Sequence, residues 1–168
     1  MARLAHRLSA NAPGDSFVDS GCIDCGACQR LAPATFDERE GKARVFRQPE
    51  DPAVLEKALM ALITCPVSAI GTIGRHDLRP AACRFPERID GPVFDCGYAS
   101  PKSFGATSYL IVRPGGNIPV DSQGTRGPSS RAWKSLAGSP SFPDPPGRRG
   151  RPRQVSSTLR VRADPARG

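Results

Sequence analysis

Cysteine is the residue type whose spacing in this chain points to chemistry. Cys22, Cys25 and Cys28 are each separated from the next by two residues, and Cys65 lies further along the chain, directly before Pro66. Thiolates are the ligands that iron–sulfur clusters take, and a close triplet with one distant cysteine can bind the four corners of a cubane cluster. We therefore predict that these four cysteines ligate one metal cluster.

This stretch resembles the ferredoxins, through the cysteine triplet and the distant Cys65-Pro66 pair. In the two-cluster bacterial pattern the Cys-Pro cysteine follows the triplet closely and serves the other cluster. Here it follows much later and no second triplet exists, so the resemblance is to single-cluster bacterial ferredoxins, in which it binds the same cluster. Cys25 occupies the corner that three-iron relatives lack. The resemblance thus implies a [4Fe–4S] cluster, with [3Fe–4S] as the less favoured alternative.

Other uses of these cysteines are disfavoured. Structural zinc usually takes two separated pairs of ligands rather than a close triplet, so we expect no zinc in this chain. Disulfides are less expected still, because the first residues lack the apolar core of a secretion signal and cysteines two residues apart in one turn are poorly placed to pair. Cys83 and Cys96 have no partner at ligand spacing, and we interpret both as ordinary thiols.

Short elements must position the cysteines. Alternation and turn residues predict strands over residues 16–19, 43–47 and 69–73, and a helical turn over residues 29–32. The strongest helix prediction starts with Asp51 as N-cap and Pro52 at the first position, has leucines at helical spacing, and ends at Cys65. We expect a small α+β, ferredoxin-like domain over residues 16–74, after a flexible N-terminus of residues 1–15.

The charge of the chain is unevenly distributed. Its 168 residues carry a formal net charge of +8, which would suit a nucleic-acid partner. However, residues 1–122 carry 14 Lys and Arg against 14 Asp and Glu, whereas residues 123–168 carry 10 against 2. The excess belongs to the C-terminal segment rather than to a folded face. Nucleic-acid binding is therefore disfavoured, and no apolar run is long enough to span a membrane.

A second segment follows a predicted linker over residues 75–92. Strand-like runs over residues 107–112 and 117–122 flank a glycine-rich turn, and this strand–turn–strand–Asp pattern resembles the first hairpin of the metallo-β-lactamase fold. Pro119 departs from the pattern because it removes a hydrogen-bond donor from the return strand. The order of the modules resembles a fused ferredoxin–metallo-β-lactamase family. Residues 93–122 would then be an incomplete fragment of that fold, and as a lone hairpin we expect it to be poorly ordered.

Residues 123–168 differ in character from everything before them. Gly, Pro, Ser and Arg dominate this segment, and no hydrophobic period is present, so we expect a disordered basic tail. When its codons are back-translated and shifted by one base, the segment can encode an amphipathic helix followed by histidines and aspartates at metal-binding spacing. The resembled family would require such residues. We therefore hypothesise a frameshift near Ser122.

These patterns predict a one-electron carrier rather than an enzyme. The alternative is a truncated, inactive remnant of a ferredoxin-fused metal-dependent hydrolase, because no histidine follows Ser122 to bind the zinc that such an enzyme needs. We expect redox proteins, such as a reductase or an oxidoreductase, as partners. We also expect a cytoplasmic location, because the thiols must stay reduced until a cluster is assembled.

Overall fold

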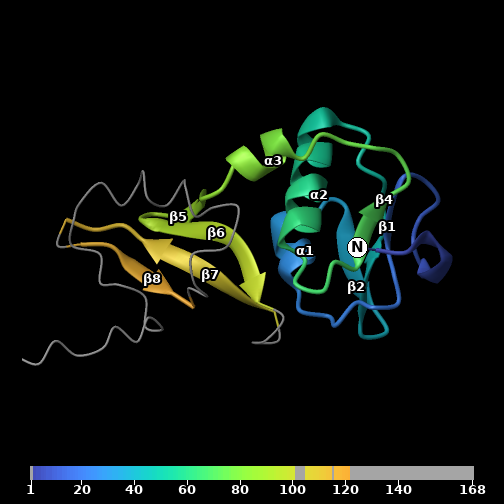
Figure 1. Cartoon of the computed structure of the whole chain (residues 1–168), viewed down its shortest axis with the longest axis horizontal. Coiled ribbons are helices and arrows are strands. Elements are labelled where there is room, and N and C mark those ends of the chain that lie inside the picture. The colour runs from blue at the N-terminus through green and yellow to red at the C-terminus, as the bar shows by residue number, and fades with distance from the viewer. Residues whose placement is uncertain (1, 101–104, 115, 122–168) are drawn as a thin grey trace, which may run out of the picture.

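The computed structural model describes residues 2–100, 105–114 and 116–121 (Figure 1). The elements, in chain order, are the 3₁₀ turn η1 (Leu4–His6), β1 (Ser16–Val18), α1 (Ala27–Leu31), β2 (Phe36–Arg39), β3 (Lys42–Val45), α2 (Pro52–Thr64), β4 (Ile70–Thr72), α3 (Arg79–Cys83), β5 (Glu87–Asp90), β6 (Val93–Ser100), β7 (Ala106–Ile111) and β8 (Ile118–Val120). The predictions for β1, α1, β3, α2 and β4 are confirmed to within a few residues, whereas β2 was not predicted.

Two small antiparallel sheets frame the cysteine loop. β1 pairs with β4, so that Val18 lies opposite Ile70, and β2 pairs with β3 in a hairpin that places Phe36 opposite Val45. All four of these side chains are buried, in one core with residues of α1 and α2. The loop that carries the triplet runs from the end of β1 into α1, so it starts and finishes on elements fixed by this core (Figure 1).

Helix α2 begins as its sequence predicts. The Asp51 carboxylate accepts hydrogen bonds from the backbone N–H groups of Ala53, at 2.8 Å, and Val54, at 3.4 Å, and Pro52 occupies the first helical turn. These bonds satisfy backbone donors that have no partner within the helix. Met60 and neighbouring residues of α2 face the core. The helix therefore ends at a fixed point and delivers Cys65 to the core side of the molecule.

The N-terminal residues are packed onto the core, which corrects the expectation of a loose entry segment over residues 1–15. Asn11 is buried, and its side chain bonds to the backbone of Leu8, Val18 and Val45. The backbone N–H of Ala12 also donates to the carbonyl of Val45, at 2.7 Å. An asparagine has two donors and two acceptor lone pairs, so one side chain can join three separate segments.

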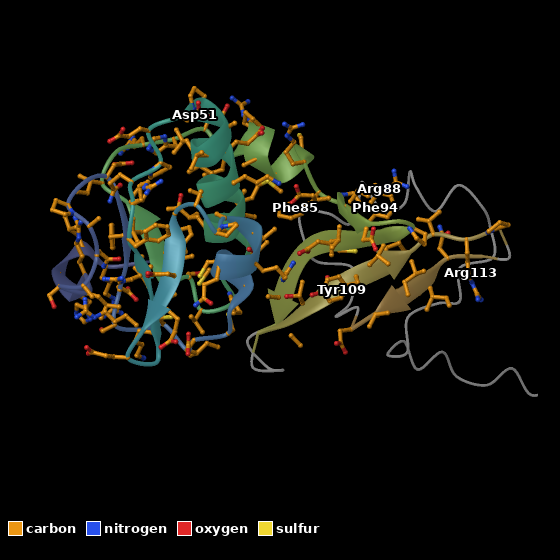
Figure 2. All side chains as sticks on the ribbon, turned by 180° about the vertical axis from the view of Figure 1, so that it is seen from behind. Asp51, Phe85, Arg88, Phe94, Tyr109 and Arg113 are labelled. Carbon is orange, nitrogen blue, oxygen red and sulfur yellow. The ribbon has the colours of Figure 1, made fainter. Side chains whose placement is uncertain are left out.

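Residues 75–92 are not the irregular linker that was predicted. They contain α3 and β5, and Ala81 and Phe85 are buried in the same core as α2. Phe85 is labelled in Figure 2, between α3 and β5. Two ion pairs, Lys57–Glu87 and Arg84–Glu56, also join this segment to α2. The linker was predicted because this stretch contains several Arg and Pro residues and no hydrophobic period. The five-residue α3 is too short to show such a period. How the chain divides into independent domains stays a prediction.

The second segment forms a four-stranded antiparallel sheet in the order β5-β6-β7-β8. The predicted hairpin is present as β7 and β8, with Leu110 opposite Pro119. It is not a lone hairpin, however, because β5 and β6 extend the sheet and Asp95 of β6 bonds to Arg30 of α1. Among the described strands, β8 with Pro119 lies at the edge of the sheet, where a missing donor costs least. The predicted tail over residues 123–168 lies outside the described residues.

Candidate cluster-binding site

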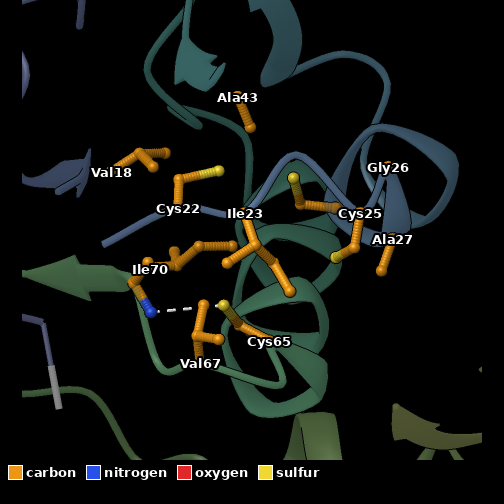
Figure 3. Close-up of a pocket in the computed structure, with 12 residues that line it drawn as sticks. Val18, Cys22, Ile23, Cys25, Gly26, Ala27, Ala43, Cys65, Val67 and Ile70 are labelled. Atoms are coloured by element: carbon orange, nitrogen blue, oxygen red, sulfur yellow. Dashed lines mark hydrogen bonds between the residues drawn. The ribbon is translucent and has the colours of Figure 1, made fainter. Parts of the chain in front are cut away.

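The fold brings the four predicted ligands to one cavity. Cys22 and Cys25 lie in the loop after β1, Cys28 lies in α1, and Cys65 lies at the end of α2. All four line a cavity whose remaining wall is almost entirely apolar (Figure 3). That wall is formed by Val18, Ile23, Gly26, Ala27, Ala43, Val67, Ala69 and Ile70. Residues more than 40 positions apart in the sequence thus face one another around a sheltered space.

The cysteine loop contains two residues in the left-handed region of backbone conformation. Asp24 has a φ of 54° and Gly26 a φ of 73°. Such angles are ordinary for glycine and tolerated by aspartate, so the sequence allows the chain to turn sharply between consecutive cysteines. The backbone N–H of Asp24 lies 3.4 Å from the sulfur of Cys22. A donor directed at sulfur stabilises negative charge there, as thiolate ligation requires.

Cys65 receives similar support from the chain that follows it. The backbone N–H of Ala69 donates to the Cys65 sulfur at 3.2 Å (Figure 3). Burial raises the pKa of the Cys65 thiol, and backbone N–H groups of Ala69, Val67 and Ile70 partly oppose that rise. Pro66 therefore begins a turn that wraps amide donors around the sulfur.

The other three cysteines also affect the ionisation of Cys28. Burial raises the pKa of Cys28 to about 12, and the charges of Cys22, Cys25 and Cys65 add to the rise. Four thiolates this close repel one another, so the site favours thiolates only when positive charge lies between them. Iron ions bound by thiolates supply such charge.

The described side chains do not form a site for a single metal ion. Within residues 2–100, 105–114 and 116–121, no three His, Cys, Asp or Glu side chains are gathered so that they could hold one metal ion. Four sulfurs around one zinc would lie roughly 3.8 Å apart, given a Zn–S bond of about 2.3 Å and tetrahedral geometry. In a cubane cluster each thiolate binds a different iron, so the ligands must be further apart. The donor set, four cysteines that line one cavity, therefore fits the predicted cluster.

Two cationic side chains beside the site were not predicted. Lys42 of β3 donates to the backbone carbonyl of Cys22. Arg30 lies two residues after Cys28 in α1. Arg30 could have been suspected from its distance of two residues from a ligand, but Lys42 reaches the loop only through the β2–β3 hairpin. Both place positive charge near a group of thiolates.

The other candidate side chains lie apart from the cavity. Cys83 is exposed at the end of α3, and Cys96 lies in β6, consistent with their interpretation as ordinary thiols. None of the six cysteines forms a disulfide. His76 is hydrogen-bonded to Asp15 at 2.7 Å. This pair joins the entrance of β1 to the exit of β4 and contributes nothing to the cavity.

Comparison with known proteins gives one family match. Residues 18–72 match the family model described as the 4Fe-4S single cluster domain of ferredoxin I. The matched segment contains Cys22, Cys25, Cys28 and Cys65, and the cluster type agrees with the predicted [4Fe–4S] cofactor. No curated protein and no solved structure gave a significant match. No helix in the described part of the chain has the length and apolar character needed to cross a bilayer.

Proposed function

We propose that this protein is a one-electron carrier in which Cys22, Cys25, Cys28 and Cys65 ligate a single [4Fe–4S] cluster. The observation that carries the proposal is the convergence of these four cysteines on one apolar cavity, within the segment that matches a single-cluster ferredoxin domain. A bound cluster of this type accepts and returns one electron. The protein supplies the ligands, the shelter from water and the path to partners.

The residues around the cavity have distinct tasks in this proposal. Val18 and Ile70 exclude water from one side, and the amides of Asp24 and Ala69 direct N–H donors at ligand sulfurs. Lys42 adds positive charge beside the loop. Amide donors and positive charge both favour the more negative, reduced state, so they raise the reduction potential, whereas apolar shelter lowers it.

Anaerobic purification of the full chain tests the proposal directly. We expect a brown protein with iron and sulfide in the 4Fe-4S stoichiometry, and an electron paramagnetic resonance signal that appears on reduction with dithionite. Colourless protein that contains zinc would overturn the proposal. Binding of a redox protein in the reduced or oxidised state, detected by calorimetry, would then identify partners.

The hydrolase alternative depends on sequence resemblance alone. The β7–β8 hairpin has the strand order that the resemblance requires, but strand–turn–strand units are common and carry little weight. The proposed frameshift concerns codons near Ser122, and sequencing the gene in independent isolates tests it. An intact reading frame in all isolates would remove this alternative. A cytoplasmic location is proposed on the same chemical ground as before, the need for reduced thiols.

A further inference from the structure

The C-terminal sheet approaches one ligand of the cluster site directly. Gly105, which precedes β7, is buried and has a φ of 81°. A Cβ at this position would lie 2.5 Å from the Cβ of Cys25, 3.1 Å from its sulfur and 3.3 Å from Pro66. Only glycine fits so close to a cysteine ligand. The chain around residue 105 therefore touches both parts of the ligand set, the triplet loop and the Cys-Pro turn.

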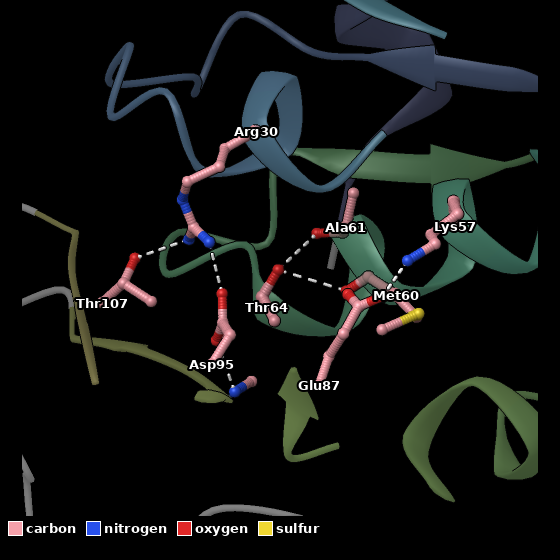
Figure 4. A network of polar contacts seen from close by, with 9 residues as sticks. Arg30, Lys57, Met60, Ala61, Thr64, Glu87, Asp95 and Thr107 are labelled. Carbon is pink, nitrogen blue, oxygen red and sulfur yellow. Dashed lines mark hydrogen bonds and ion pairs between the residues drawn. The ribbon is translucent and has the colours of Figure 1, made fainter. Parts of the chain in front are cut away.

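Arg30 holds this sheet against the triplet. Its guanidinium forms an ion pair with Asp95 of β6 and donates to the hydroxyl of Thr107 of β7 at 3.1 Å (Figure 4). It also lies 5.6 Å from the ring centroid of Tyr109. Asp95 is 1% exposed, and its other oxygen accepts from the backbone N–H of Gly97. Because Arg30 belongs to the same short helix as Cys28, the sheet is attached to the element that carries the ligands.

The attachment leaves a groove beside the Cys25 corner of the site. An open groove runs between the cysteine loop and β7, lined by Cys25, Gly26, Ala27, Arg30, Gly105, Ala106, Thr107 and Tyr109. Cys25 lines both this groove and the sheltered cavity. Cys25 is therefore the cysteine of the set that water in this groove can reach, and Gly105 lies beside it.

We propose that the C-terminal sheet is a cover for the cluster site, and that Gly105 is a positioning residue that sets the water access of the Cys25 corner. This inference rests on the proposed function. It assigns to the sheet a role that the matched ferredoxin segment, residues 18–72, does not contain. The sheet shields the site without supplying a ligand.

Gly105→Ala tests the cover, and Gly116→Ala is the matched control. Gly116 has a φ of 109°, so alanine is strained there too, but apart from its chain neighbours no atom of the described residues lies within 4 Å of its added Cβ. We expect Gly105→Ala to make bleaching of the cluster by the iron chelator bathophenanthroline about tenfold faster, because overpacking of one methyl group is enough to shift an opening equilibrium by that factor. Its reduction potential should rise, because reduction adds negative charge that water stabilises. Gly116→Ala should match wild type in both measurements.

A milder variant covers the case in which Gly105→Ala does not fold. Thr107→Val keeps the shape of the side chain but removes the hydrogen bond from Arg30, and it should raise the bleaching rate by a smaller factor. If anaerobically purified wild-type protein contains no iron and sulfide, the proposed function is overturned, and this inference with it. If the wild-type protein contains a full cluster, but Gly105→Ala and Gly116→Ala have equal bleaching rates and equal reduction potentials, only the inference about the cover is overturned. If the Gly105→Ala protein does not accumulate, the inference is overturned when the cluster of Thr107→Val bleaches at the same rate as that of the wild type.

Discussion

Arg30 in α1 and Asp95 in β6 form an ion pair that joins the cysteine-bearing domain to the C-terminal sheet (Figure 4). The pair is asymmetric, since the Arg30 side chain is 36% exposed and Asp95 is 1% exposed. Loss of the arginine would leave a buried carboxylate without its partner, whereas neutralising Asp95 would leave an arginine that water can reach. The two residues therefore contribute unequally to stability.

Arg30→Met should destabilise the protein more than Asp95→Asn. We expect Arg30→Met to lower the free energy of unfolding by ~1–3 kcal/mol, which is below the usual cost of breaking a fully buried pair because Arg30 is partly solvated. Urea unfolding of the loaded protein measures the difference. Arg79→Met is the control, because the Arg79–Asp77 pair is exposed and its loss should change stability little. Equal effects of Arg30→Met and Arg79→Met would contradict the prediction.

Replacement of Cys65 by serine should abolish or greatly reduce cluster content. Cys65 shares the cavity with the triplet, and its sulfur already accepts an amide hydrogen bond. Cys83→Ser is the matched control, because Cys83 is exposed and outside the cavity. Iron and sulfide analysis of the two variants, purified anaerobically, decides between them. Full cluster content in Cys65→Ser would show that the ligand set is wrong.

Removal of the metal should destabilise the cysteine-bearing domain. The apolar core is small, and four thiolates around one cavity repel one another without positive charge between them. Incubation with dithionite and a chelator should therefore lower the thermal unfolding midpoint by many degrees, as followed by circular dichroism. Reconstitution with iron and sulfide should restore it. An unchanged midpoint in protein shown to be free of iron would contradict this expectation.

Asn11→Ala should destabilise the fold although Asn11 is distant from the cysteines. The side chain makes four hydrogen bonds to backbone groups, and the bonds to Val18 and Val45 are buried. Alanine would leave those groups unsatisfied, at a cost of about 2–4 kcal/mol. Leu4→Ala in the same segment, at an exposed residue, should change stability little. Thermal unfolding measures both, and a neutral Asn11→Ala would show that this contact does not anchor the N-terminus.

Alkylation of Cys96 should be slow at pH 8 and should accelerate as the pH rises. Burial raises the pKa of Cys96 from 9.0 to about 11, the nearby charge of Asp95 adds to the rise, and a hydrogen bond with Ser108 opposes it. Two pKa units reduce the reactive thiolate roughly 100-fold at pH 8, so the rate should increase up to about pH 11. Exposed Cys83 should react first with iodoacetamide, as mass spectrometry can show. Faster labelling of Cys96 than of Cys83 at pH 8 would be the contrary result.

Local patterns in the sequence determined most of the elements that carry the four cysteines that we propose as ligands. The spacing of Cys22, Cys25 and Cys28 is visible within seven residues. Asp51, Pro52 and the helical spacing of the leucines predict α2 from the sequence alone. Such signals are readable because hydrogen bonds, caps and helical periodicity act between residues that are close in the chain.

The tertiary structure alone decided how the second segment is attached. Nothing near Phe85 in the sequence shows that it enters the core of α2, and nothing near Gly105 shows that it meets Cys25, which lies 80 residues earlier. The sequence therefore predicted the ligands, and the fold showed which segment lies against them. The physical reason is that a glycine in close contact has no side chain to mark the contact, and an ion pair such as Arg30–Asp95 joins two residues that each look like ordinary surface charges until the chain brings them together.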